Sequence, residues 1–164
     1  MTSRPTYDDA NLILRLYEMR REDRMRKARG WFTANFKVTT WDELQKLAPA
    51  GSDENASYRM VVTYWDMAAS FITSGVLHRE LFFQSGRELL LVWERVRAVL
   101  PAIRQQYKDP HLWGHLETVG NEFADHFKGR GGEAYDAFLN RIGVARGERG
   151  GRGTEGADGP EKSV

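Results

Sequence analysis

Most of the histidines of the chain lie in one short segment, where they could bind a metal ion. At 3.6 residues per turn, an α-helix would place four potential ligands on one stripe: His111, His115, Glu122 and His126. The first two and the last two are each spaced i, i+4, which allows two side chains to share a metal. The pairs lie roughly 10 Å apart along the axis, so each needs further ligands from another helix. A metal-dependent enzyme is therefore one hypothesis, and the polar edge of a structural helix is the alternative.

A second group of residues is basic. Its six cations outnumber Glu22 and Asp23, which gives a local charge of +4: Arg20, Arg21, Arg24, Arg26, Lys27 and Arg29. Aromatic side chains follow at Trp31 and Phe32, and cations beside aromatics suit a phosphate backbone. The cations scatter around a helix, however, as is typical of a solvated surface. Nucleic-acid or polyanion binding through residues 20–29 is therefore an alternative hypothesis.

Asp66 is the one charged residue between positions 60 and 77. That stretch is long enough for a membrane span, but a central carboxylate costs about 2.5–3.5 kcal/mol there, which favours a helix in a protein core. A buried carboxylate needs a partner. The expected partner is an arginine of the first helix, and the alternative is a catalytic pair with Glu18, Glu94 or Glu122.

No catalytic motif accompanies these candidates. The sequence contains no phosphate-binding glycine loop, no Gly-x-Ser-x-Gly and no His-Glu-x-x-His. It has no cysteine, which excludes disulfides, thiolate nucleophiles and iron–sulfur clusters, and its net charge of +1 provides no long-range field. We therefore expect no cofactor, and an enzyme is the less favoured reading. The N-terminal residues lack the apolar core of a signal peptide, so we expect a cytoplasmic protein.

The elements that must position these residues are helical almost throughout. Apolar residues recur at three- and four-residue spacing, which predicts an all-α fold. We expect an irregular bundle of about six to eight helices around a central apolar helix at about 54–74. The first segment is either one long helix or two helices with a bend at residues 22–24. A capping box is expected at Thr40, an interruption at Pro101, and a helix start at Asp109.

The chain divides into a single helical domain over residues 1–142 and a C-terminal tail over residues 143–164. Seven of those last 22 residues are glycine and none is aromatic, which predicts disorder. Arginine–glycine pairs in the tail are similar to unstructured RNA-binding segments. Four acidic residues balance them, so a plain disordered end is favoured.

Several segments resemble a known family. They read LILRLYE at 12–18, RKARGWF at 26–32, VVTYWDMAASFITSGVL at 61–77 and ELFF at 80–83. The sequence resembles, over roughly residues 7–142, an uncharacterised family of small all-helical bacterial proteins, a domain of unknown function. The resemblance implies a helical fold and a bacterial, cytoplasmic setting, and it implies no activity, cofactor or site residue.

The sequence therefore favours a non-enzymatic protein-interaction or regulatory module. Its partner would be another protein or a second copy of the chain, with no membrane involved. Five tryptophans and several amphipathic helices supply the aromatic anchors that protein interfaces favour.

Overall fold

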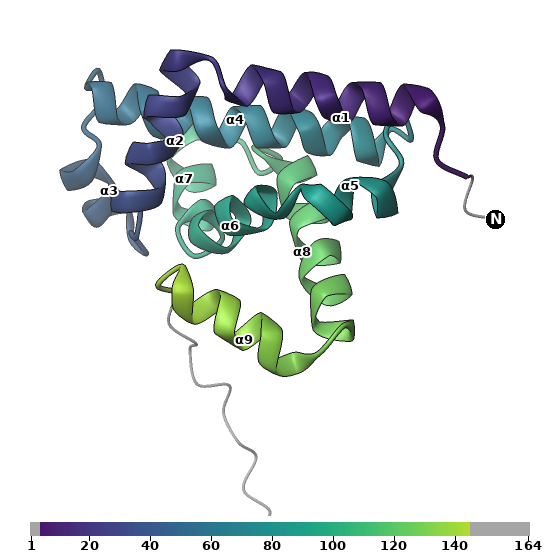
Figure 1. The fold of residues 1–164 in the computed structure, drawn as a ribbon. Coiled ribbons are helices and arrows are strands. Elements are labelled where there is room, and N and C mark those ends of the chain that lie inside the picture. Colours follow the sequence, from purple (N-terminus) through teal and green to yellow (C-terminus); the bar gives the residue numbers. More distant parts are fainter. Residues whose placement is uncertain (1–3, 145–164) are drawn as a thin grey trace, which may run out of the picture.

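The computed structural model describes residues 4–144, and all regular structure in this range is α-helical. Figure 1 shows the nine helices of this range: α1 Tyr7–Arg20, α2 Asp23–Asn35, α3 Trp41–Leu47, α4 Asp53–Thr73, α5 Arg79–Ser85, α6 Arg87–Val96, α7 Leu100–Tyr107, α8 Gly114–Gly129 and α9 Gly132–Arg141. The predicted all-α fold is confirmed, with more helices than the six to eight expected. The tail predicted at 143–164 lies outside the described residues, apart from Gly143 and Val144.

The expected breaks account for the helix count. α1 and α2 are separated at Arg21 and Glu22, and the Glu22 carboxylate accepts two backbone amides in the first turn of α2. Thr40 forms the predicted capping box of α3. Pro101 lies in the first turn of α7, where a missing N–H costs no helical hydrogen bond, so one predicted helix becomes α6 and α7.

α4 is the central helix, as predicted. It begins after Ser52, whose hydroxyl accepts the Asn55 amide, and ends before Gly75, which has a positive φ of 75°. It contacts α2, α6 and α8. Most of its circumference is buried, including the fully enclosed side chains of Tyr58 and Trp65. Along residues 4–144, no helix combines the length and hydropathy that crossing a membrane requires.

The helix start predicted at Asp109 is wrong. The Asp109 carboxylate accepts the His111 amide within a turn, and α8 begins only at Gly114. Trp113, directly before it, has a left-handed backbone with φ 55°, which breaks any continuous helix from Asp109. The first turn of α8 is capped from another helix: Asp66 Oδ1 of α4 accepts the Leu116 amide at 2.9 Å.

Two charged residues of α6, Glu94 and Arg95, are buried and hold the C-terminal helix. Nε and Nη2 of Arg95 donate to the Ile142 carbonyl at 3.0 and 2.8 Å. Its Nη1 donates to three carbonyl oxygens at the end of α2: those of Phe32, Thr33 and Phe36. Glu94 accepts the Tyr135 hydroxyl of α9. These contacts join the ends of α2 and α9 through α6.

Candidate functional site

The four metal-ligand candidates have different surroundings in the structure. His111 precedes α8, so it does not have helical i, i+4 spacing to His115. Both histidines line a polar pocket of about 410 Å³, whose wall also contains the Arg104 guanidinium. Glu122 pairs with Arg79 at 3.0 Å, and His126 packs against the Phe83 ring. Within residues 4–144, no three His, Asp or Glu side chains gather to hold a metal.

The basic segment divides into two cations that contact another helix and four that are exposed. Arg20 and Arg29 both contact Glu88 of α6, and Arg26 pairs with Asp23. The Arg21 guanidinium lies over the Tyr17 ring. Arg24 and Lys27 are exposed. Polyanion binding through residues 20–29 therefore stays a prediction, and it would depend on the four exposed cations.

Asp66 is half-buried, and its carboxylate serves the backbone of α8. Its partner is an amide rather than the arginine that the sequence analysis favours. Of the three carboxylates considered as catalytic mates, Glu94 contacts Tyr135 and Arg97, Glu122 contacts Arg79, and Glu18 is exposed on α1. The described contacts assign Asp66 to helix capping.

α1 packs against the core through Leu12, Ile13 and Leu16, and polar contacts anchor it further. Only Asp9 and Leu16 of this helix are buried. Asp9 Oδ1 accepts the His78 amide at 2.7 Å, directly before α5. The Tyr64 hydroxyl of α4 donates to the Leu16 carbonyl. Burial raises the pKa of Tyr64 to about 12, so this hydroxyl keeps its proton at neutral pH.

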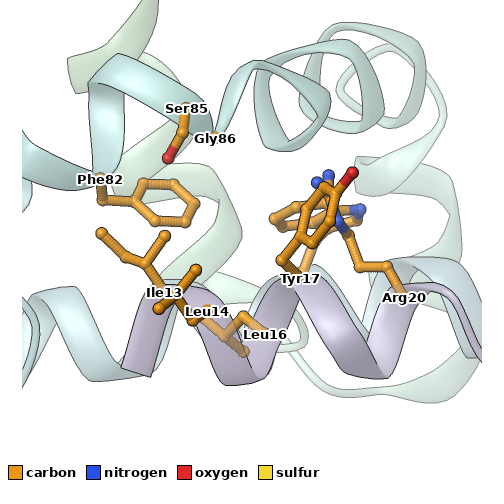
Figure 2. Close-up of a pocket in the computed structure, with 9 residues that line it drawn as sticks. Ile13, Leu14, Leu16, Tyr17, Arg20, Phe82, Ser85 and Gly86 are labelled. Carbon is orange, nitrogen blue, oxygen red and sulfur yellow. The ribbon is translucent and has the colours of Figure 1, made fainter. Parts of the chain in front are cut away.

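A pocket of about 310 Å³ lies between α1, α4 and α5 (Figure 2). Figure 2 shows Ile13 of α1 pointing toward the Phe82 ring of α5, with Tyr17 and Arg20 further along α1. Trp65 of α4 also lines it. Gly86 permits this arrangement, because a Cβ there would lie 2.4 Å from the Phe82 ring. The lining is apolar except for a few groups, as in pockets that bind small molecules.

The charged wall of this pocket is formed by Arg20, which lines it and belongs to a cluster with Glu88 and Arg29 that carries an excess positive charge. Arg29 binds Glu88 through two short hydrogen bonds of 2.6 and 2.5 Å, which raise the pKa of Arg29 and satisfy the carboxylate. Arg20 Nη1 contacts the same carboxylate at 3.3 Å. Two guanidinium groups therefore share one carboxylate, and the cluster has a net charge of +1.

The Arg20 guanidinium has unused donors. Its side chain is 15% exposed, and its Cζ lies 5.0 Å from the Tyr17 ring centroid and 5.4 Å from that of Trp65. Among residues 4–144, Nε and Nη2 of Arg20 make no hydrogen bond. The neighbouring Trp65 Nε1–H is enclosed and likewise has no acceptor in the described part of the chain. A guanidinium can donate five hydrogen bonds, so Arg20 can donate to a further anionic partner.

One stripe on the outer face of α1 is apolar, and it lies beside exposed polar side chains such as Asn11, Arg15 and Glu18. Tyr7, Leu14 and Tyr17 are 81%, 60% and 48% exposed, which makes them among the most exposed large apolar side chains described. With Ala10 and Arg21 they follow one another at spacings of three and four residues. This stripe lies beside the pocket, because Leu14 and Tyr17 also line it.

Sequence reasoning missed this site. The pattern of α1 indicated one buried face but gave no sign that Leu14 and Tyr17 would stay exposed. Glu88, which organises the charged wall, lies 68 residues from Arg20 and 59 from Arg29 in the sequence. The available signal was the presence of both Arg20 and Tyr17 on one helix. It could not identify Glu88 as the residue that contacts Arg20.

Comparison with known proteins identifies a family and no activity. A family model described as "Domain of unknown function (DUF4760)" matches residues 5–123. This range includes α1 to α7 and all of the pocket residues, whereas α9 lies beyond it. No curated protein and no solved structure matches the chain.

Proposed function

We propose that this chain, which belongs to the family described as a domain of unknown function (DUF4760), is a non-enzymatic interaction module. It pairs with a second copy of itself through α1. The observation that carries the proposal is the exposed apolar stripe of α1. Its residues recur at the a and d positions of a heptad, the pattern by which two helices bury a common seam. The cytoplasm remains our proposed compartment, in keeping with a cysteine-free sequence.

The residues of the stripe complement themselves when two α1 helices run antiparallel. With Leu14 on the two-fold axis, Tyr17 of one copy lies at the level of Asn11 of the other, one residue from the small Ala10 on the same stripe. Tyr7 lies opposite Arg21, which favours a cation–π contact. Asp8 at the start of α1 approaches the basic end of the second helix. A two-fold contact requires one surface to fit itself in this way.

The first experiment is sedimentation velocity over a range of protein concentrations. The wild-type chain is expected to form a dimer, and Leu14→Glu is expected to be a monomer, because two carboxylates would meet on the axis. Met19→Glu is the matched control. Met19 is 52% exposed on the same helix but lies roughly 200° around the axis from Tyr17, so this variant should remain dimeric.

Cross-linking tests the direction of the two helices. The chain has no cysteine of its own, so single-cysteine variants report one position each. Leu14→Cys should form an intermolecular disulfide, because the two copies of this position adjoin each other. Tyr7→Cys should not, because antiparallel pairing separates its two copies by roughly 20 Å. A monomeric wild type, or equal cross-linking of both variants, would overturn the antiparallel pair.

A further inference from the structure

The pocket beneath α1 has the size of a small-ligand site. Its volume is about 310 Å³, at the lower end of the range for such sites. An apolar cavity of about 150 Å³ accommodates benzene, so this pocket holds roughly twelve non-hydrogen atoms. Its walls are formed by side chains that are mainly hydrocarbon, among them Ile13, Leu16 and Phe82. The occupant that fits is therefore a small molecule with an apolar body.

The charged wall of the pocket determines which chemical group the other end of the ligand should carry. Arg20 lines the pocket with Nε and Nη2 free of hydrogen bonds to the described residues. Glu88 does not neutralise it fully, because Arg29 binds the same carboxylate through both of its oxygens. One added negative charge makes the cluster of Arg20, Arg29 and Glu88 neutral. A carboxylate also matches the guanidinium fork in geometry.

We infer that this pocket binds a small monocarboxylate with an apolar body, of the size of a medium-chain fatty acid. The carboxylate pairs with Arg20 at the end of the pocket beside Tyr17 and Trp65. The hydrocarbon chain packs against Ile13 and Phe82, which point toward one another in Figure 2. All lining residues come from one chain, and two of them, Leu14 and Tyr17, also belong to the α1 stripe.

Calorimetric titration of the full chain with decanoate, below its micelle concentration, tests the inference. Decanoate has about the twelve non-hydrogen atoms that the pocket holds. Decanol is the matched ligand, because it keeps the chain length and lacks the charge, and acetate keeps the charge and lacks the chain. Decanoate should bind at one site per chain, at least tenfold more tightly than decanol, and acetate should not bind measurably.

Variants locate the site. Arg20→Gln should weaken decanoate at least tenfold and bring it level with decanol, whereas Arg21→Gln should leave binding unchanged, because Arg21 does not line the pocket. Ser85 is exposed at the pocket wall, so Ser85→Phe should fill the mouth and abolish binding. Gln84→Phe, one residue away on the exposed surface of α5, should bind as the wild type does.

Nuclear magnetic resonance gives a readout that folding defects do not imitate. The indole N–H signal of Trp65 should move on adding decanoate, whereas that of Trp41 in α3, which does not line the pocket, should stay in place. Equal binding of decanol and decanoate, or retained binding by Ser85→Phe, would overturn the inference. Because Ser85 and Gln84 lie outside the α1 stripe, these outcomes are separate from whether the chain forms a dimer.

Discussion

At the scale of single residues, Gly30 and Gly120 show that neighbouring side chains determine whether a glycine is required inside a helix. A Cβ at Gly30 in α2 would meet nothing within 4 Å. At Gly120 in α8 it would lie 2.2 Å from Trp93 Cγ of α6. Both helices are regular at these positions, so the local cost of glycine relative to alanine is similar in each. Only Gly120 lets two helices approach closely.

We therefore expect opposite signs for the same substitution. Gly120→Ala should lower the free energy of unfolding by about 2 kcal/mol, because Trp93 has to move out of a packed core. Gly30→Ala should raise it by about 0.5–1 kcal/mol, because alanine restricts the unfolded chain and favours the helix. Urea unfolding of both variants measures the difference. A stabilising Gly120→Ala would contradict the close α6–α8 contact.

At the scale of elements, the attachment of α9 depends on one buried cation. Among residues 4–144, Arg95 pairs with no carboxylate; it donates instead to carbonyl oxygens at the C-terminal ends of α2 and α9. The negative ends of two helix dipoles favour a cation at this position. Burial lowers the pKa of Arg95, but these carbonyl groups supply the hydrogen bonds that water would otherwise provide.

Arg95→Met should keep the apolar stem and remove all of these donors. We expect a loss of about 3 kcal/mol in the free energy of unfolding, because buried carbonyl oxygens remain without partners. Amide exchange should become faster in α9 before it does in α4. Arg59→Met is the control, since Arg59 is exposed on α4, and its effect should stay within about 0.5 kcal/mol. Unchanged exchange in α9 would contradict the attachment through Arg95.

At the scale of the whole molecule, stability should depend on pH through the anchor of α1. The amide and hydroxyl of Thr6 and the amide of His78 donate to the Asp9 carboxylate and hold its pKa below the ordinary value of 3.8. A carboxyl group with a depressed folded-state pKa stabilises the protein above its unfolded pKa. That contribution is lost as the pH falls through the folded-state value.

Asp9→Asn tests this dependence, because asparagine keeps the shape of the side chain and cannot ionise. At about pH 6 the variant should unfold at a lower urea concentration than the wild type, and the difference should shrink towards about pH 3. Asp8→Asn is the control: Asp8 is exposed in the same first turn and shares the same helix dipole. An equal effect of both variants, or a difference that persists in acid, would assign the stability to something other than the Asp9 anchor.

The sequence by itself determined the elements whose signals are local. The apolar pattern of α4, the capping box at Thr40 and the position of Pro101 are each properties of a few neighbouring residues, and each appears in the structure where it was predicted. The predicted start of α8 was wrong because it, too, rested on local sequence signals alone. Asp109 and Pro110 gave a good local signal, but the helix begins later, where Asp66 from a distant helix caps it.

Only the tertiary structure decided the candidate site. The pocket requires α1, α4 and α5 to lie side by side, and its charge requires Glu88 to meet two arginines that lie far away in the sequence. Periodicity shows that a side chain lies on a given face of a helix, but it does not show which element covers that face. The exposed stripe of α1 was therefore indistinguishable from a core stripe until the packing was known, because packing alone leaves Leu14 and Tyr17 uncovered.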